Sequence, residues 1–263
     1  MKKYLYIFKS ELMTNFQYIF DLIWGFIGYA IMLFILMNLW QYLYDDPNQI
    51  INGYSYSQMV WYVIITEILW SVISGRKLCK KISMDVKTGN IAYNINKPYS
   101  YIGYILATHL GDIVIKGIIY SILGMILGFI FIGSFPNISF ISILLVLLSC
   151  ILSNIISIFF ICFIGLFSLF IEDSGPFYWL YSKVILLLGT IFPIEYFPEV
   201  IRPILKFSPV YVISYGPAKL FVDFSYSGAF SIIVAQVIYI LISYLLCLFV
   251  YKKGVKKLNV NGG

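Results

Sequence analysis

Residues 140–171 contain no charged side chain and consist mainly of Ile, Leu, Phe and Ser. A helix needs about 20 apolar residues to cross a hydrocarbon core of about 30 Å, and this stretch exceeds that length. The rest of the chain follows the same pattern, since 61% of all residues are hydrophobic, 11% are charged and the mean hydropathy is +0.90. A soluble domain of 263 residues cannot bury so much apolar surface. The sequence therefore predicts an integral membrane protein.

Six segments are apolar enough to cross the membrane, which predicts an all-α membrane protein with six transmembrane helices. The predicted crossings are residues 22–43, 56–75, 103–133, 140–171, 177–193 and 230–251. The fifth is the shortest because Pro193 interrupts it. Residues 1–21 place Leu5, Phe8 and Leu12 on one side of a helix and polar residues on the other. We expect this N-terminal helix to lie in the membrane interface without crossing it.

Positive charge marks the cytosolic side of the membrane. Residues 76–98 form a basic loop with a single acid, Asp85. The basic residues of this loop are Arg76, Lys77, Lys80, Lys81, Lys87 and Lys97. Loops rich in Lys and Arg stay on the cytosolic side, and both ends of the chain are also basic. We therefore expect both termini in the cytosol, and we attribute the net charge of +6 to topology, not to nucleic-acid binding.

The basic loop also contains a short helical pattern. Leu78, Ile82 and Val86 recur every four residues and predict one apolar side of a helix. Gly89 and Asn90 follow this pattern and favour the end of the helix. Two interpretations are open at this point. The segment is either an anchor that fixes the orientation in the membrane or a docking helix for a soluble partner.

Residues 194–229 form an unusual segment before the last predicted crossing. They are too apolar for an ordinary loop, and their prolines are too frequent for a continuous transmembrane helix. These prolines are Pro198, Pro203, Pro209 and Pro217. Irregular backbone is tolerated at membrane depth only where protein covers it. The pattern predicts an outer re-entrant hairpin of short helices.

The order of these elements resembles the type-2 family of ATP-binding-cassette (ABC) exporter permeases, and within it the short six-span subfamily. The sequence Gly-Asn-Ile at 89–91, followed by Lys-Pro-Tyr-Ser at 97–100, is similar to the first cytosolic loop of that subfamily. The sequence FPIEYFPEVIRPILKFSPVYVISYGPAKL at 192–220 is a second point of likeness. The resemblance covers nearly the whole chain, and the order of elements is more specific than either motif.

The resemblance implies a permease subunit that forms a transport path with a second permease, which is the same or a homologous chain. It also implies two copies of a soluble ABC ATPase and a cargo such as a drug, antimicrobial peptide, lipid or glycan. Together with the AT-rich codon signature of frequent Ile, Lys, Asn and Tyr, it implies a bacterial cytoplasmic membrane. The residues that match the ATPase-coupling position of the family are Leu78, Lys81, Ile82, Asp85, Val86 and Gly89.

Motifs for chemistry within this chain are missing from the sequence. It has no phosphate-binding loop of the Gly-x-x-x-x-Gly-Lys-Ser/Thr type, so we expect ATP and Mg²⁺ to bind to the partner ATPase. One histidine and four scattered cysteines match no metal motif. We therefore expect no cofactor in this chain and no enzymatic activity of its own.

Glu67 falls within the second predicted crossing, where a carboxylate is costly unless it faces protein or a wet cavity. It is either packed and hydrogen-bonded between helices or a polar contact in the substrate path that favours cationic cargo. Trp24, Tyr29 and Trp61 are aromatic candidates for the lining of the same path.

The third predicted crossing carries two further patterns. His109, Asp112 and Lys116 share one helical side, which indicates either a local network at the inner interface or a proton relay. A stripe of small residues follows and predicts close helix packing, within one subunit or between two. The stripe consists of Gly117, Ser121, Gly124 and Gly128. Two rival functions remain: an ion-coupled secondary transporter that uses Glu67, His109 and Asp112, and a substrate-capture membrane subunit without ATP coupling.

Overall fold

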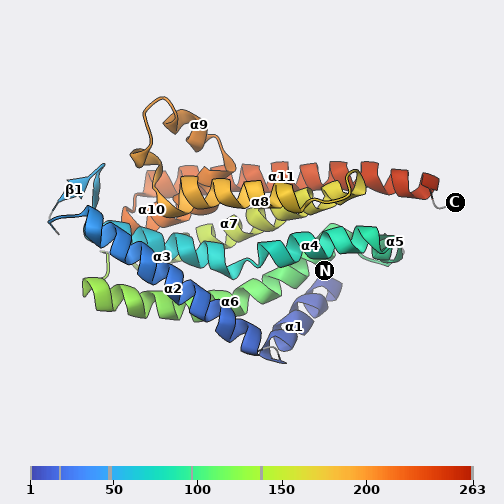
Figure 1. The fold of residues 1–263 in the computed structure, drawn as a ribbon, viewed down its shortest axis with the longest axis horizontal. Helices are drawn as coiled ribbons and strands as arrows, with labels where there is room; N and C mark the ends of the chain where they lie inside the picture. Colours follow the sequence, from blue (N-terminus) through green and yellow to red (C-terminus); the bar gives the residue numbers. More distant parts are fainter. Residues whose placement is uncertain (1, 18, 47–48, 96, 137–138, 262–263) are drawn as a thin grey trace.

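The chain forms an elongated bundle of helices in the computed structural model, which describes residues 2–17, 19–46, 49–95, 97–136 and 139–261 (Figure 1). The small hairpin that contains β1 and the short helix α9 lie at one end of the bundle, which we call the outer end after the sequence prediction. The helix α5 and the C-terminus lie at the other end, which we call the inner end. The α-helices are α1 (Lys2–Gln17), α2 (Ile19–Leu43), α3 (Tyr56–Val72), α4 (Gly75–Lys87), α5 (Asn90–Ile95), α6 (Tyr101–Ile132), α7 (Phe140–Leu166), α8 (Gly175–Ile185), α9 (Arg202–Lys206), α10 (Gly216–Val222) and α11 (Tyr226–Asn261).

Short segments connect and extend these helices. Two are 3₁₀ turns, η1 (Phe167–Leu169) and η3 (Ile194–Tyr196), and two are π-helical, η2 (Leu186–Ile191) and η4 (Tyr211–Tyr215). The only described strands, β1 (Ile50–Ile51) and β2 (Tyr54–Ser55), pair antiparallel between α2 and α3.

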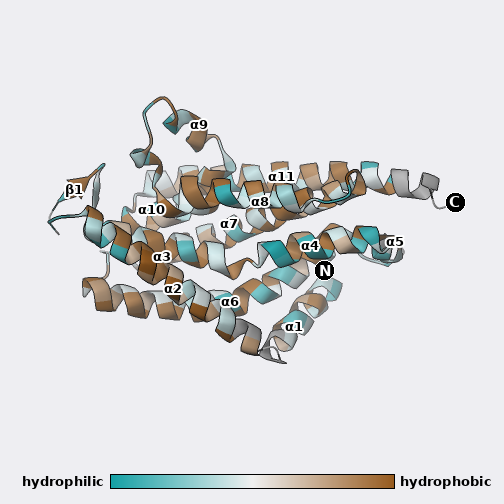
Figure 2. Ribbon diagram, in the orientation of Figure 1, coloured by the Kyte–Doolittle hydropathy of each residue, from teal (hydrophilic) through white to brown (hydrophobic). Residues whose placement is uncertain are grey.

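Within the described residues, five helices are long and apolar enough to cross a membrane. They cover Ile23–Leu43, Tyr56–Lys87, Tyr101–Ile132, Phe140–Leu169 and Tyr226–Lys256. Figure 2 shows their central stretches mostly in brown, whereas teal is frequent on α1 and α4. The structure thus confirms an all-α membrane protein. The sixth predicted crossing, 177–193, corresponds to α8 followed directly by η2, and the count of six stays a prediction.

The second crossing continues into the basic loop. The helix breaks only at Ile73 and Ser74, after which α4 runs on in nearly the same direction as α3 (Figure 1). After this break α4 begins at Gly75, one residue before the predicted start of the basic loop at residue 76. As predicted, Gly89 follows the end of α4 with a positive φ of 75°, a conformation in which glycine is not strained.

The N-terminal helix packs on the inner half of α6. An added Cβ on Gly111 would lie 2.9 Å from the backbone oxygen of Phe8, so the two helices approach closely there. Tyr4 Oη accepts a hydrogen bond from the Ser100 backbone amide at 3.0 Å. Leu5 remains exposed, as expected for a helix that contacts lipid as well as protein. The predicted interfacial segment, residues 1–21, contains α1 and the first residues of α2, which starts at Ile19, and its place in the interface stays a prediction.

The outer segment folds as a series of short helices from η3 to α10. Much of α10 is buried, with Ala218 fully covered and Leu220 nearly so, and it packs between α3 and α7. By contrast α9 projects from the bundle (Figure 1). The segment thus passes from the exposed α9 to the buried η4 and α10, and the re-entrant hairpin stays a prediction. The last helix begins at Tyr226, before the predicted position 230.

Two glycines of the small-residue stripe serve packing within this chain. An added Cβ on Gly124 would lie 2.5 Å from Tyr29 Oη, and one on Gly128 would lie 2.5 Å from Trp61 Cη2. Gly117 and Ser121 instead line an apolar groove between α6 and α7. The stripe therefore brings α6 against α2 and α3.

Candidate functional site

A polar cavity of about 890 Å³ lies inside the otherwise apolar bundle. We call it the central cavity. Its floor is α3, and its walls are α2 and α6 on one side and α8 on the other, with α1 and α4 at the inner end. The titratable residues around it are Glu11, Tyr29, Glu67, Lys77, Lys81, His109, Asp112, Lys116, Tyr120 and Lys183. Polar groups at this depth require water, protein partners or a ligand.

The deep end of the central cavity is formed by Tyr29, Glu67 and Ser71. Ser71 lies one helical turn after Glu67 and donates a hydrogen bond of 3.3 Å to Glu67 Oε2. The ring of Tyr29 stacks on Tyr120, with ring centroids 4.9 Å apart. The Tyr120 ring has room for this stacking because residue 25 of α2, which faces it, is a glycine. An added Cβ on Gly25 would lie only 2.4 Å from Tyr120 Oη. The deep end thus combines a carboxylate with stacked phenol rings.

Several buried polar atoms around the cavity lack a partner. Within the described residues, no hydrogen bond reaches Tyr29 Oη, Glu67 Oε1, Thr108 Oγ1 or His109 Nε2, and all four residues line the central cavity. Leaving a buried polar atom unpaired costs about 1–3 kcal/mol, so such atoms normally mark a site where water or a ligand binds. The central cavity is therefore a candidate binding site.

The inner end of the cavity is held together by Lys116. Its Nζ lies 2.7 Å from Asp112 Oδ2 and 2.6 Å from Ser74 Oγ. Because Ser74 belongs to the break between α3 and α4, this contact ties the break to α6. The predicted pairing of Asp112 with Lys116 is confirmed, which leaves both groups engaged in a local network.

Glu11 reaches the same inner end from α1. Burial raises the pKa of Glu11, and the charge of Asp112 acts in the same direction, while Lys81 and Lys116 oppose the shift. Lys81 Nζ lies 5.1 Å from the centre of the Tyr104 ring, in cation–π contact. The inner end is therefore a mixed cluster of acids and bases.

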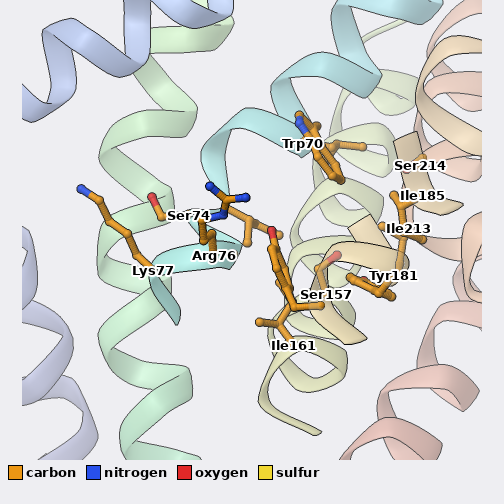
Figure 3. Close-up of a pocket in the computed structure, with 14 residues that line it drawn as sticks. Trp70, Ser74, Arg76, Lys77, Ser157, Ile161, Tyr181, Ile185, Ile213 and Ser214 are labelled. Carbon is orange, nitrogen blue, oxygen red and sulfur yellow. The ribbon is translucent and has the colours of Figure 1, made fainter. Parts of the chain in front are cut away.

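A second, smaller pocket of about 380 Å³ lies on the other side of the α3–α4 break. In Figure 3, Tyr181, Ile185 and Ile213 lie on one side of this pocket, and Lys77 extends the opposite way, toward α6. Trp70 and Ser74 line both this pocket and the central cavity. The residues around the α3–α4 break thus separate the two cavities.

The predicted coupling residues do not share one exposed surface. Leu78 and Ile82 are fully buried and Val86 nearly so, because α4 packs this side against α7 and η1 of its own chain. Ile82 contacts the α7 backbone at Gly165, where an added Cβ would lie 3.0 Å from Ile82 Cβ. The apolar side of α4 is therefore covered by its own chain, and the role of these residues in ATPase coupling stays a prediction.

The polar coupling candidates also have partners within the chain. Asp85 Oδ2 accepts a hydrogen bond of 2.8 Å from Tyr101, and Lys81 lies at Tyr104. Gly89 is exposed at the turn into α5. The exposed inner tip of the chain comprises this turn together with Ala92 and Tyr93 of α5.

Of the predicted path residues, three meet at the central cavity and one does not. Trp24, Tyr29 and Glu67 line it, whereas Trp61 is buried toward the outer end, stacked on Phe135 with ring centroids 5.1 Å apart. The sequence analysis did not identify the other polar lining residues of α3, α4 and α8. Ser71 carried a usable signal, because its spacing of four from Glu67 places both on one helical side. Lys183 also carried a signal, because it is a charged residue within the predicted crossing 177–193, whereas Ser74 carried none.

The membrane-length helices, the polar cavity between them and the basic inner loop define a multi-pass membrane transport protein. The family model described as ABC-2 family transporter protein matches residues 13–262. The chain therefore belongs to the ABC-2 transporter family, whose members are membrane permease components of ABC transporters and imply an ABC ATPase as partner. No curated protein matches the chain.

Proposed function

We propose that this chain is the permease subunit of an ATP-driven exporter and forms the transport path together with a second permease, the same or a homologous chain. The observation that supports this most directly is the central cavity, whose four unpartnered polar atoms lie inside an apolar bundle. Its walls, α2 and α8, would face the second permease. Cargo from the cytosol or the inner leaflet would enter this space, in keeping with export of a drug, antimicrobial peptide, lipid or glycan.

The orientation and energy source belong to the same proposal. The basic inner tip and the basic C-terminal tail favour a bacterial cytoplasmic membrane with both termini in the cytosol. ATP and Mg²⁺ would bind to two separate ATPase subunits, and the force of ATPase closure would reach this chain through its inner tip. From the tip, α4 leads directly to the α3–α4 break beside the central cavity.

We propose that the ATPase contacts the exposed tip and not the apolar side of α4. Since Leu78 and Ile82 are buried within the chain, the ATPase would bind the exposed residues of the turn and of α5. Tyr93 is the largest of these and is 67% exposed. Its ring lies 4.4 Å from Lys97 Nζ, which fixes it at the tip.

The test is co-purification of this chain with ABC ATPases of its host, followed by ATP hydrolysis measurements in lipid nanodiscs. We compare wild type with the double variant Ala92→Asp/Tyr93→Asp. The matched control is Val200→Asp, since Val200 is 84% exposed in the outer segment, away from α2 and α8. We expect the double variant to lose the ATPase or its turnover, and the control to retain both.

Two outcomes contradict the proposal. If transport follows an ion gradient and continues without any ATPase, the chain is a secondary transporter. If the chain holds cargo but never alters ATP turnover, it is a substrate-capture subunit. Size-exclusion profiles of each variant exclude misfolding as the cause of a loss.

A further inference from the structure

We propose that the deep end of the central cavity binds the protonated amine of an amphiphilic cargo, with the Glu67 carboxylate as its counter-ion. This inference rests on the proposed function and deepens it, because it names the chemical class of the cargo. It follows from the unpartnered polar atoms of the cavity, from the positions of its acidic and basic residues and from the apolar residues at its open side.

The carboxylate of Glu67 lacks a hydrogen-bond donor at one of its oxygens. Glu67 is fully buried, and only one of its carboxylate oxygens has a partner, the Ser71 hydroxyl at 3.3 Å. No salt bridge to Glu67 exists within the described residues. A carboxylate accepts hydrogen bonds, and an ammonium group supplies three donors and the missing positive charge.

The aromatic surroundings suit the same ligand. Tyr29 is 2% exposed, its hydroxyl is unpartnered, and it lines the cavity from α2. The phenol oxygen can accept a second hydrogen bond from an ammonium group, and aromatic faces attract cations. The glycines at 25 and 124 leave the space that the stacked pair of Tyr29 and Tyr120 requires. Larger residues at these glycines would displace the pair.

The bases around the cavity lie mainly away from Glu67. Lys116 is neutralised by Asp112 at 2.7 Å, and Lys81 lies at Tyr104 beside the inner end. Asp112 precedes Tyr120 by two helical turns, or about 12 Å along α6. Lys116 lies closer, one helical turn or about 6 Å before Tyr120, but its Nζ is held by Asp112 and Ser74. Lys183 lines the cavity from α8.

The open side of the cavity suits an amphiphile. Its rim includes Trp24, which is 72% exposed, and Leu186, while Gly28 has no described atom within 4 Å of an added Cβ. A molecule with an alkyl chain can keep this chain in the apolar rim while its amine reaches Glu67. A lateral approach from the inner leaflet also avoids the basic inner end.

The experiment measures binding without ATP. The permease, purified with its ATPase, is placed in phosphatidylcholine nanodiscs, and radiolabelled dodecylamine is bound and corrected for partition into protein-free nanodiscs. Unlabelled dodecylamine and dodecanol, which differ only in the head group, then compete. We expect the amine to compete at least about tenfold better than the alcohol in wild type.

The variants test the residues. Glu67→Gln keeps the size and one acceptor oxygen but removes the charge, and we expect it to abolish the preference for the amine. Tyr29→Phe should reduce the preference several-fold, and it provides a second test if Glu67→Gln folds poorly. Glu172→Gln is the matched control, because it neutralises an exposed carboxyl group that does not line the central cavity, and it should retain the wild-type preference.

Equal competition by amine and alcohol in wild type overturns this inference, as does an unchanged preference in Glu67→Gln. Either result leaves the exporter assignment standing, since that depends on ATP turnover and on the tip variant. Conversely, a wild-type chain that prefers the amine but neither retains an ATPase nor alters its turnover contradicts the exporter assignment alone.

Discussion

The Tyr54 hydroxyl donates a hydrogen bond of 3.0 Å to the carboxylate of Glu195, which lies 141 residues later in the chain. Tyr215 donates to the other oxygen of the same carboxylate, and Lys219 Nζ lies 3.8 Å from it. A single acid of the outer segment therefore joins the β hairpin to η4 and α10. This network closes the outer end of the bundle.

We expect Tyr54→Phe to destabilise the protein by about 1–2 kcal/mol, because it removes a hydrogen bond to a charged group that is about one-third exposed. Thermal unfolding in detergent measures the change. Tyr226→Phe is the control, since Tyr226 is 64% exposed. Equal unfolding temperatures for the two variants would show that the outer network adds no stability.

The contact of Lys116 with Asp112 and Ser74 leads to a second prediction. Lys116→Met removes the cation and leaves Asp112 unpaired in a half-buried position, at an expected cost of about 2 kcal/mol. The double variant Asp112→Asn/Lys116→Met should recover part of this loss, because no lone charge remains. Chemical unfolding of the three proteins tests this order, and a double variant less stable than Lys116→Met contradicts it.

The burial of α4 leads to a third prediction, which separates folding from docking. Ile82→Asp should cost about 3 kcal/mol or more, because it buries a charge against α7. Lys80→Asp, on the exposed side of the same helix, should leave the unfolding temperature nearly unchanged. Expression yield and unfolding temperature provide the readout. A stable Ile82→Asp protein that merely loses the ATPase would restore the apolar side of α4 as the docking surface.

Close packing of α6 leads to a fourth prediction. Gly128→Ala places a Cβ 2.5 Å from the Trp61 ring and 2.8 Å from Ile64 Cδ1, so we expect a loss of about 1–3 kcal/mol. Gly117→Ala is the matched control on the same helix, since its Cβ meets no described atom within 4 Å. It should be neutral or slightly stabilising. The prediction fails if both variants unfold at the same temperature.

The raised pKa of Glu11 leads to a prediction about pH. A carboxyl group with a raised pKa in the folded state binds its proton more tightly there than in the unfolded state. Its contribution to stability is full below the ordinary glutamate pKa of about 4.3 and is lost as the pH rises through the raised value. Glu11→Gln does not titrate. We therefore expect the stability of wild type relative to Glu11→Gln to fall as the pH rises above about 4, measured by thermal unfolding. A rise over this range contradicts it.

The sequence determined the membrane environment and the main helices by local physics, although several helix ends differ by a few residues from the predicted ones. Uncharged runs such as 140–171 exceed the bilayer thickness, and a helix is the main way to satisfy their backbone in lipid. Gly89 ends α4 as predicted, because the chain adopts a positive φ there. The spacing of Leu78, Ile82 and Val86 likewise predicted one side of a helix.

Only the tertiary structure decided what covers each of these sides. Periodicity marks Ile82 as apolar, but it does not distinguish a partner protein from α7 of the same chain. In a membrane this ambiguity is greater, because lipid and protein interior are equally apolar. The tertiary fold therefore buried Trp61 away from the cavity, and it brought Tyr29, 38 positions before Glu67, to the same deep end. The contact of residues so far apart in the chain depends on how the helices cross, and the local sequence does not encode this crossing.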